Sequence, residues 1–202
     1  MHDMQTEAGA PLSSTPTSDA AAERRPAPRR ALLLTLGAAA VVVYALDQLT
    51  KAWAVTSLTP GEPRNLLGSL LRLNLIENPG AAFSIATGAT WVLTIIAVGV
   101  VAVIVYSIRR LGSRGWAWAL GLLLGGALGN LTDRLVRAPG PGRGHVVDFL
   151  ELPHWPIFNV ADSAIVSAAV LIVLLALRGT GLDGRRATRA GGRHEADGGT
   201  GA

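Results

Sequence analysis

The chain has 202 residues, of which 50% are hydrophobic, 16% are charged and 5% are aromatic, and its formal net charge is +4. A typical soluble domain carries about a quarter charged residues, so this composition argues against a soluble domain. Cysteine is absent, which excludes disulfides, thiolate metal ligands, a cysteine nucleophile and lipidation of this chain on cysteine.

The two ends of the chain differ in composition from its middle. Residues 1–30 are rich in Ala, Pro, Ser, Thr and charge, and residues 179–202 are similar. Such segments bury too little apolar surface to offset the entropy lost on ordering, so we expect disordered tails. Residues 31–178 are then expected to form one membrane domain.

Long apolar stretches without charge predict membrane-spanning helices, because a span needs roughly 20 mostly apolar residues. No small-residue cleavage site follows the first stretch, which favours a retained span over a secretory signal. The expected fold class is an all-α membrane protein with four transmembrane helices. We expect the spans at about residues 31–51, 89–108, 115–134 and 158–177.

The segments between these spans predict two outer regions and one inner turn. In residues 57–88, the sequence LLRLNLIEN approaches the alternation of a strand at the membrane interface. Residues 135–157 form a second outer segment, which we expect to be a loop.

Twelve of the 18 lysines and arginines lie in the two tails, in the turn after the second span or just after the fourth. The positive-inside rule places these groups, and therefore both termini, in the cytoplasm. This basic excess orients the protein and can contact anionic membrane lipids, so no nucleic-acid partner is expected. The oligomeric state stays open, with a monomer as the working expectation.

Glycines recur at intervals of four in the third span, at Gly121, Gly125 and Gly129. This spacing places them on one helix face, where small residues let membrane helices approach closely. Glycine is also simply common in membrane helices. We nevertheless expect this glycine face to pack closely against a neighbouring helix, and we call this contact the glycine seam.

Five acids are expected to gather at the outer side: Asp47, Glu77, Asp133, Asp148 and Asp162. Acids in or beside membrane spans are costly and mark functional sites more often than surface acids do. Structural roles compete with this interpretation for every one of them.

Asp47 and Lys51 can pair at i and i+4, and Glu77 precedes a turn where a solvated acid is expected. Asp133 adjoins Arg134, which favours an organising role over a proton-shuttling one.

Asn159 and Asp162 are spaced like a helix N-cap and an acid in the first turn. Asp148 is wrapped in apolar residues within HVVDFL. On spacing alone, functional and structural roles for Asp148 and Asp162 are equally supported.

Two carboxyl groups placed close together share a proton, because both cannot easily ionise. The ionised member can take a proton from an attacking water while the other polarises a peptide carbonyl. This chemistry needs neither metal nor cofactor, and the chain carries no HExxH and no GxSxG motif. A proton- or ion-coupled transporter and a non-catalytic membrane scaffold remain alternatives.

Five motifs occur along the chain in this order: DQLTK (47–51), ENPGAAFS (77–84), GGALGNLTDR (125–134), VVDF (146–149) and FNVADS (158–163). In content, order and expected topology they resemble lipoprotein signal peptidase, the bacterial type II signal peptidase. The resemblance implies an aspartic endopeptidase of the bacterial inner membrane, with its active site toward the outer face. It would remove the signal peptide from prolipoproteins, cutting before the cysteine that carries diacylglyceryl.

The same resemblance implies roles for individual residues. Asp148 and Asp162 would form the catalytic dyad, and Asp133 would support it. The other implied residues support the dyad or bind substrate: Asp47, Lys51, Asn78, Gly80, Asn130, Arg134, Asn159 and Ala161. Asn78 and Gly80 would belong to a β-cradle on the substrate side. The loop between Arg134 and His145 is longer and richer in Gly and Pro than the family pattern leads us to expect.

Overall fold

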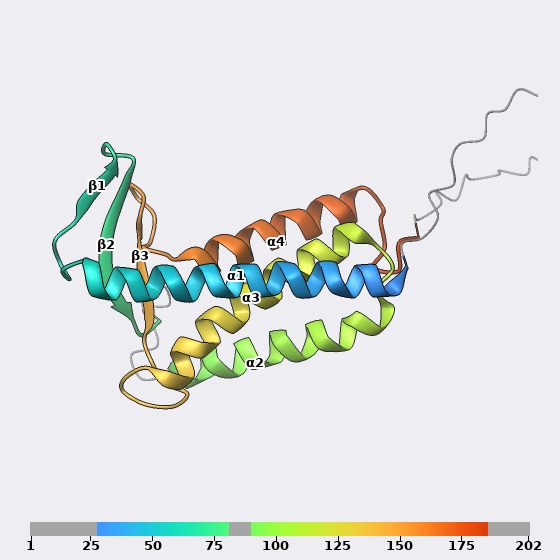
Figure 1. The fold of residues 1–202 in the computed structure, drawn as a ribbon, viewed down its shortest axis with the longest axis horizontal. Helices are drawn as coiled ribbons and strands as arrows, with labels where there is room; N and C mark the ends of the chain where they lie inside the picture. Colours follow the sequence, from blue (N-terminus) through green and yellow to red (C-terminus); the bar gives the residue numbers. More distant parts are fainter. Residues whose placement is uncertain (1–27, 81–89, 186–202) are drawn as a thin grey trace, which may run out of the picture.

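The computed structural model describes residues 28–80 and 90–185. Most of the two tails expected to be disordered therefore lies outside the described residues. Four long helices run side by side, and a small sheet covers one end of them (Figure 1).

The helices occur close to the expected spans, and the first is longer than expected because it runs on through Lys51 to Ser57. α3 lies centrally and contacts the three other long helices. The helices are α1 (Arg29–Ser57), α2 (Thr90–Ser107), its 3₁₀ extension η2 (Ile108–Arg110), α3 (Arg114–Val136) and α4 (Val160–Leu177).

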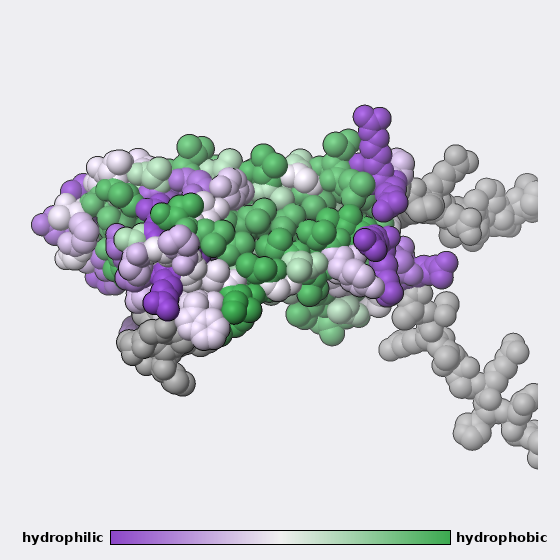
Figure 2. Space-filling view, turned by 90° about the horizontal axis from the view of Figure 1, so that it is seen from below, coloured by the Kyte–Doolittle hydropathy of each residue, from purple (hydrophilic) through white to green (hydrophobic). Residues whose placement is uncertain are grey.

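Three of these helical segments, α1, α2 with η2, and α4, are long and apolar enough to cross a membrane. α3, expected as a fourth span, contains glycines, Asn130 and two tryptophans, which lower its mean hydropathy. Because α3 is enclosed by its neighbours, it needs less apolar surface than a helix that faces lipid. Figure 2 shows apolar side chains along the helices and hydrophilic ones toward the two ends.

The expected glycine seam is confirmed. A Cβ atom added at Gly125 would lie 2.6 Å from the carbonyl oxygen of Ala40 in α1, and one at Gly121 would lie 2.7 Å from that of Leu36. Gly126, on a neighbouring face, approaches α4 in the same way, at 2.6 Å from the carbonyl oxygen of Ala161. α3 thus has close backbone contact with both helices.

The sheet has three antiparallel strands in the order β1-β2-β3, namely β1 (Arg64–Leu67), β2 (Leu71–Asn78) and β3 (Val146–Glu151). β2 confirms the strand expected from the alternation in LLRLNLIEN. The expectation of a loop around Asp148 is wrong, because Asp148 lies in β3 and pairs with Ile76 of β2. A small core that includes Ala54, Leu75 and Phe149 seats the sheet on the end of α1.

The residues that follow α4 pack against the opposite end of the helices. The Trp116 Nε1 group donates a 2.9 Å hydrogen bond to the carbonyl oxygen of Thr180, and Gly112 N donates one of 2.9 Å to that of Leu182. Leu182 also contacts a buried cluster that includes Leu111. This segment joins the end of α4 to the turn between α2 and α3.

Candidate active site

Asn159 lies between the two aspartates expected to form the dyad. Its Nδ2 donates a 2.6 Å hydrogen bond to Asp148 Oδ1. Its Oδ1 accepts a 2.9 Å hydrogen bond from the backbone of Asp162, and its own backbone N–H donates to Asp162 Oδ2 at 3.2 Å. The expected N-cap on α4 is therefore confirmed, as a reciprocal capping box. The same cap holds both carboxyl groups.

Two further amide side chains complete the surroundings of the pair. Asn78 Nδ2, at the end of β2, donates to Asp148 Oδ2 at 2.7 Å, and Asn130 Nδ2 of α3 donates to Asp162 Oδ1 at 2.8 Å. Each carboxyl group thus accepts hydrogen bonds on both oxygens. Three asparagines from three separate elements orient the two acids.

Asp148 is almost completely buried, with 2% of its surface exposed. Burial raises the pKa of Asp148 to about 7. The negative charge of Asp162 also raises this pKa, whereas the hydrogen bond from Asn78 lowers it because it favours the charged form. At neutral pH this carboxyl group is therefore protonated for part of the time. A buried acid of this kind, beside a second acid, suits proton transfer.

Behind the pair lies a buried ionic cluster centred on Lys51. Lys51 Nζ is 2.8 Å from Asp47 Oδ2, 2.8 Å from Asp133 Oδ2 and 2.9 Å from Asn130 Oδ1. An ammonium group has three protons, so these three acceptors use all of them. The i,i+4 pair expected from the sequence is present, and Asp133 extends it to α3.

Asp47 and Asp133 also bind backbone groups of the elements that carry the dyad. Asp47 Oδ1 accepts a 2.9 Å hydrogen bond from Ala161 N in the first turn of α4, which adds negative charge at the helix N-terminus. Asp133 Oδ2 accepts one of 3.2 Å from Val147 N, next to Asp148. The cluster therefore positions α4 and β3 relative to each other.

Arg134, the cation next to Asp133 in the sequence, does not form the ion pairs of Asp133. Asp133 contacts Lys51 and Arg137, whose Nε is 2.7 Å from Asp133 Oδ1. Arg134 Nη1 instead donates to the carbonyl oxygens of Asn78 and Gly144, at 3.1 and 2.9 Å. Arg134 thus ties β2 to the loop that leads into β3. Arg137 was missed in the sequence, although its i+4 spacing from Asp133 is a usable signal.

Gly80 fixes the orientation of Asn78. Its N–H donates a 2.8 Å hydrogen bond to Asn78 Oδ1, which leaves Nδ2 directed at Asp148. Its φ of 117° is one that side chains disfavour, and a Cβ there would lie 2.7 Å from Leu93 Cδ1. Glu77, by contrast, has a side chain that is 70% exposed, with its Oε2 3.8 Å from His145 Nδ1.

A mostly apolar cavity of about 270 Å³ lies beside this site, between α2, α3, α4 and β3. Its walls include Leu93 and Ile96 of α2 and Ile165 of α4, and Asn130 and Arg134 also line it. Thr94 of α2, which the sequence did not single out, is buried and donates a 2.8 Å hydrogen bond to the carbonyl oxygen of Gly142. α2 is thereby anchored to the loop before β3.

The acids of the site are not arranged for a metal. Among residues 28–80 and 90–185, no group of three or more His, Asp or Glu side chains could hold a metal ion. Lys51 occupies the position between Asp47 and Asp133 where a cation would be held.

Comparison with known proteins decides the family. The family model described as "Signal peptidase (SPase) II" matches residues 39–178. The chain belongs to the signal peptidase II family. Its similarity to curated members extends well beyond short motifs, because the lipoprotein signal peptidase of Mycobacterium tuberculosis (strain H37Rv) is 52% identical over 189 residues, 92% of this chain and 93% of that protein. The lipoprotein signal peptidase of Rhodococcus jostii is 56% identical over 158 residues, 78% of each chain.

Solved structures support the fold of this signal peptidase II family member. A structure titled "Bacterial membrane enzyme structure by the in meso method at 1.9 A resolution" superposes with a TM-score of 0.63 at 30% identity, covering 75% of this chain and 95% of that one. A second, at 2.3 Å, gives the same TM-score at 28% identity, over 79% and 95%. The family and these neighbours favour a membrane peptidase over the transporter alternative.

Proposed function

We propose that this protein is an aspartic endopeptidase that removes the signal peptide from diacylglyceryl-modified prolipoproteins, cutting just before the lipidated cysteine. The observation that carries the proposal is the position of Asn159, which holds Asp148 and Asp162 within one helix cap beside an apolar cavity. Family membership supplies the reaction class, and these two acids are the best candidates to perform it.

The surroundings of the two acids support different roles for them. Asp148, with a pKa of about 7, is the member that holds the proton and polarises the scissile carbonyl. Asp162 lies in the first turn of α4, where the helix terminus favours a negative charge, so it is the base. In the first stage, water adds to the carbonyl carbon, Asp162 takes a water proton and Asp148 protonates the carbonyl oxygen. In the second stage, Asp162 protonates the leaving nitrogen, the C–N bond breaks and Asp148 regains its proton.

The membrane arrangement follows from the same helices. In this proposal α3 also crosses the membrane, so residues 31–178 form a four-span domain of the bacterial inner membrane. The basic groups Arg29, Arg109 and Arg178 belong on the cytoplasmic side, with both termini, and the sheet on the outer side. The apolar cavity then receives the lipid-embedded part of the substrate, and Asn130 and Arg134 meet its polar part. One chain supplies all these groups, so a monomer suffices.

The proposal is tested with purified protein, a diacylated precursor peptide and an unlipidated control peptide. Asp148→Asn and Asp162→Asn should each lower turnover of the lipidated peptide on the order of 10³-fold, since each removes a proton-transfer group. Glu77→Gln, which alters an exposed acid of β2, is the matched control and should retain activity. Near-normal turnover in either dyad variant would refute the assignment, and equal cleavage of both peptides would refute the lipid requirement.

A further inference from the structure

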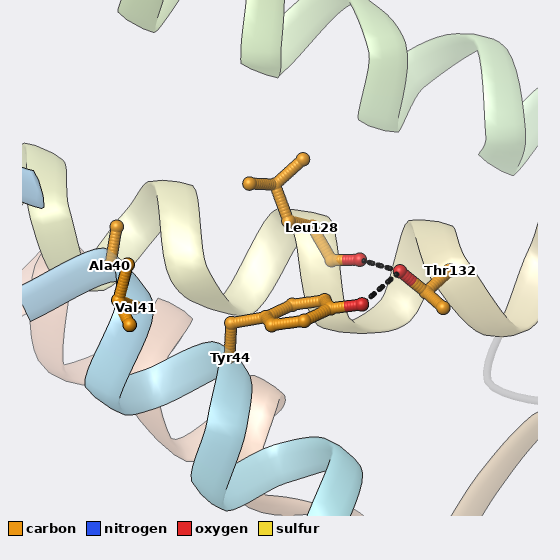
Figure 3. A pocket seen from close by; sticks show the side chains of 5 residues that line it. All are labelled: Ala40, Val41, Tyr44, Leu128 and Thr132. Carbon is orange, nitrogen blue, oxygen red and sulfur yellow. Dashed lines mark hydrogen bonds between the residues drawn. The ribbon is translucent and has the colours of Figure 1, made fainter.

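A second groove lies on the side of α3 turned away from the dyad. It has a volume of about 330 Å³ and is lined by Ala40, Val41, Tyr44, Leu128 and Thr132, from α1 and α3 only (Figure 3). At about 100° per residue along a helix, Leu128 and Thr132 lie roughly 160° around α3 from Asn130 and Arg134. The groove is therefore separate from the cavity that serves the catalytic site.

One end of this groove is polar and the rest is apolar. The hydroxyl groups of Tyr44 and Thr132 lie 3.3 Å apart, and Thr132 Oγ1 also donates to the carbonyl oxygen of Leu128 at 2.8 Å (Figure 3). Thr132 has a single hydroxyl proton, which the shorter bond to Leu128 uses, so Tyr44 is the donor in the 3.3 Å contact; a lipid oxygen beside Tyr44 can take that proton in place of Thr132 Oγ1. Ala40, Val41 and Leu128 continue the groove by about one helical turn toward the far end of the helices.

In the proposed membrane arrangement, the hydroxyl pair lies near the ester level of the outer leaflet. Thr132 is four residues from the end of α3, which is about 6 Å at 1.5 Å per residue. The sheet, on the outer side in the proposed orientation, begins beyond this end. The pair therefore lies near the outer interface, and the apolar part of the groove points toward the middle of the bilayer.

We propose that this groove binds one diacyl glycerophospholipid of the outer leaflet. The Tyr44 hydroxyl donates to an ester carbonyl of the lipid, and one acyl chain lies along Val41 and Leu128. The site requires α3 to cross the membrane, but it does not require the proposed catalytic roles. Tyr44 is one turn from Asp47, and Thr132 adjoins Asp133. The bound lipid therefore packs against α1 and α3, the two helices that hold the Lys51 cluster.

Photo-crosslinking tests the site directly. The full-length protein is reconstituted in vesicles that contain a phospholipid with a diazirine in its acyl chain, and labelled positions are mapped by mass spectrometry. Labelling should concentrate on Tyr44 and Leu128. Val41→Trp, which fills the groove from its rim, should lower that labelling at least fivefold, whereas Val42→Trp should not. Val41 and Val42 are 67% and 56% exposed, so the two substitutions are closely matched.

Competition identifies the group that is recognised and separates the lipid from the substrate. Unlabelled ester-linked phospholipid should displace the label better than its ether-linked analogue, and Tyr44→Phe should remove this difference. The diacylated precursor peptide should leave the label in place, because it binds on the opposite side of α3. The proposal would be overturned if lipid-facing residues outside the groove were labelled equally strongly, or if Val41→Trp left the labelling unchanged. It would also be overturned if ester-linked and ether-linked lipids displaced the label equally well, or if the precursor peptide displaced it.

Discussion

Asn159 contributes three polar groups to the two acids, one to Asp148 and two to Asp162. Its amide can donate to Asp148 while its carbonyl oxygen caps Asp162, which neither a carboxylate nor an alkyl side chain could do. The distance between the two acids therefore depends on the start of α4. A shift of this helix start would move Asp162 and the hydrogen bond to Asp148 together.

The pKa of Asp148 gives a pH prediction with a defined sign. Asp148 must carry its proton in the proposed mechanism, so activity should fall as the pH rises through about 7. The hydrogen bond from Asn78 favours the ionised form, so Asn78→Ala should raise this pKa and move the alkaline limb of kcat/KM to higher pH. The exposed Asn65→Ala is the control and should leave the limb in place. A limb that moved to lower pH would contradict the role assigned to Asp148.

Lys51 is the residue whose loss should be least tolerated. Lys51→Met would leave Asp47 and Asp133, both completely buried, without their shared cation. Removing one partner of a buried ionic group costs about 3–5 kcal/mol, because an uncompensated charge remains. Thermal unfolding in detergent measures this loss. The control is Arg72→Met, which removes a half-exposed ion pair with Glu151 and should cost about 1 kcal/mol or less.

At the scale of elements, the seam between α1 and α3 leaves no room for one methyl group. Gly125→Ala would place a Cβ 2.6 Å from the carbonyl oxygen of Ala40, so the helices would have to separate. Gly99→Ala in α2, where nothing lies within 4 Å, is the matched control. We expect Gly125→Ala to lower both the melting temperature and peptidase activity, and Gly99→Ala to stabilise slightly, since alanine is favoured over glycine in helices by about 1 kcal/mol. Equal melting temperatures in the two variants would show that the seam is not tight.

Among the elements, the helices and β2 could be predicted from local pattern, but the pairing of β3 with β2 could not. Its residues Val146 to Leu150 lack the alternation of β2, because both faces of β3 are covered. Its partner β2 lies about 70 residues earlier in the chain, and pairing at such separation leaves no local trace. A run of β-branched and aromatic residues around Asp148 was the available signal.

The orientation of the whole molecule can be tested because the chain contains no cysteine. Ser69→Cys lies between β1 and β2, and Arg110→Cys lies at the opposite end of the helices; both native residues are exposed. In intact cells, a membrane-impermeant maleimide should label the first variant and label the second only after permeabilisation. The reverse pattern would place the dyad on the cytoplasmic side and contradict the proposed topology.

The assembled site shows where prediction from sequence ends. Composition predicted the helices, and i,i+4 spacing predicted the contact between Asp47 and Lys51. The contact between Lys51 and Asp133, and the use of Arg137 instead of Arg134, depend on how α1 and α3 pack, which periodicity alone does not specify. Motif resemblance named most of the residues that meet there, but it did not indicate which atoms meet.

The capping box at the head of α4 also bears on how the protein is made. Asn159 and Asp162 stand at the head of α4, the last helix among the described residues, so a nascent chain that has formed only α1 to α3 has Asp148 but lacks the second acid and its bridge. Under the proposed mechanism, such a growing polypeptide cannot hydrolyse neighbouring membrane proteins. In that proposal, hydrolytic capacity arises only once the final hydrophobic segment has been threaded into place.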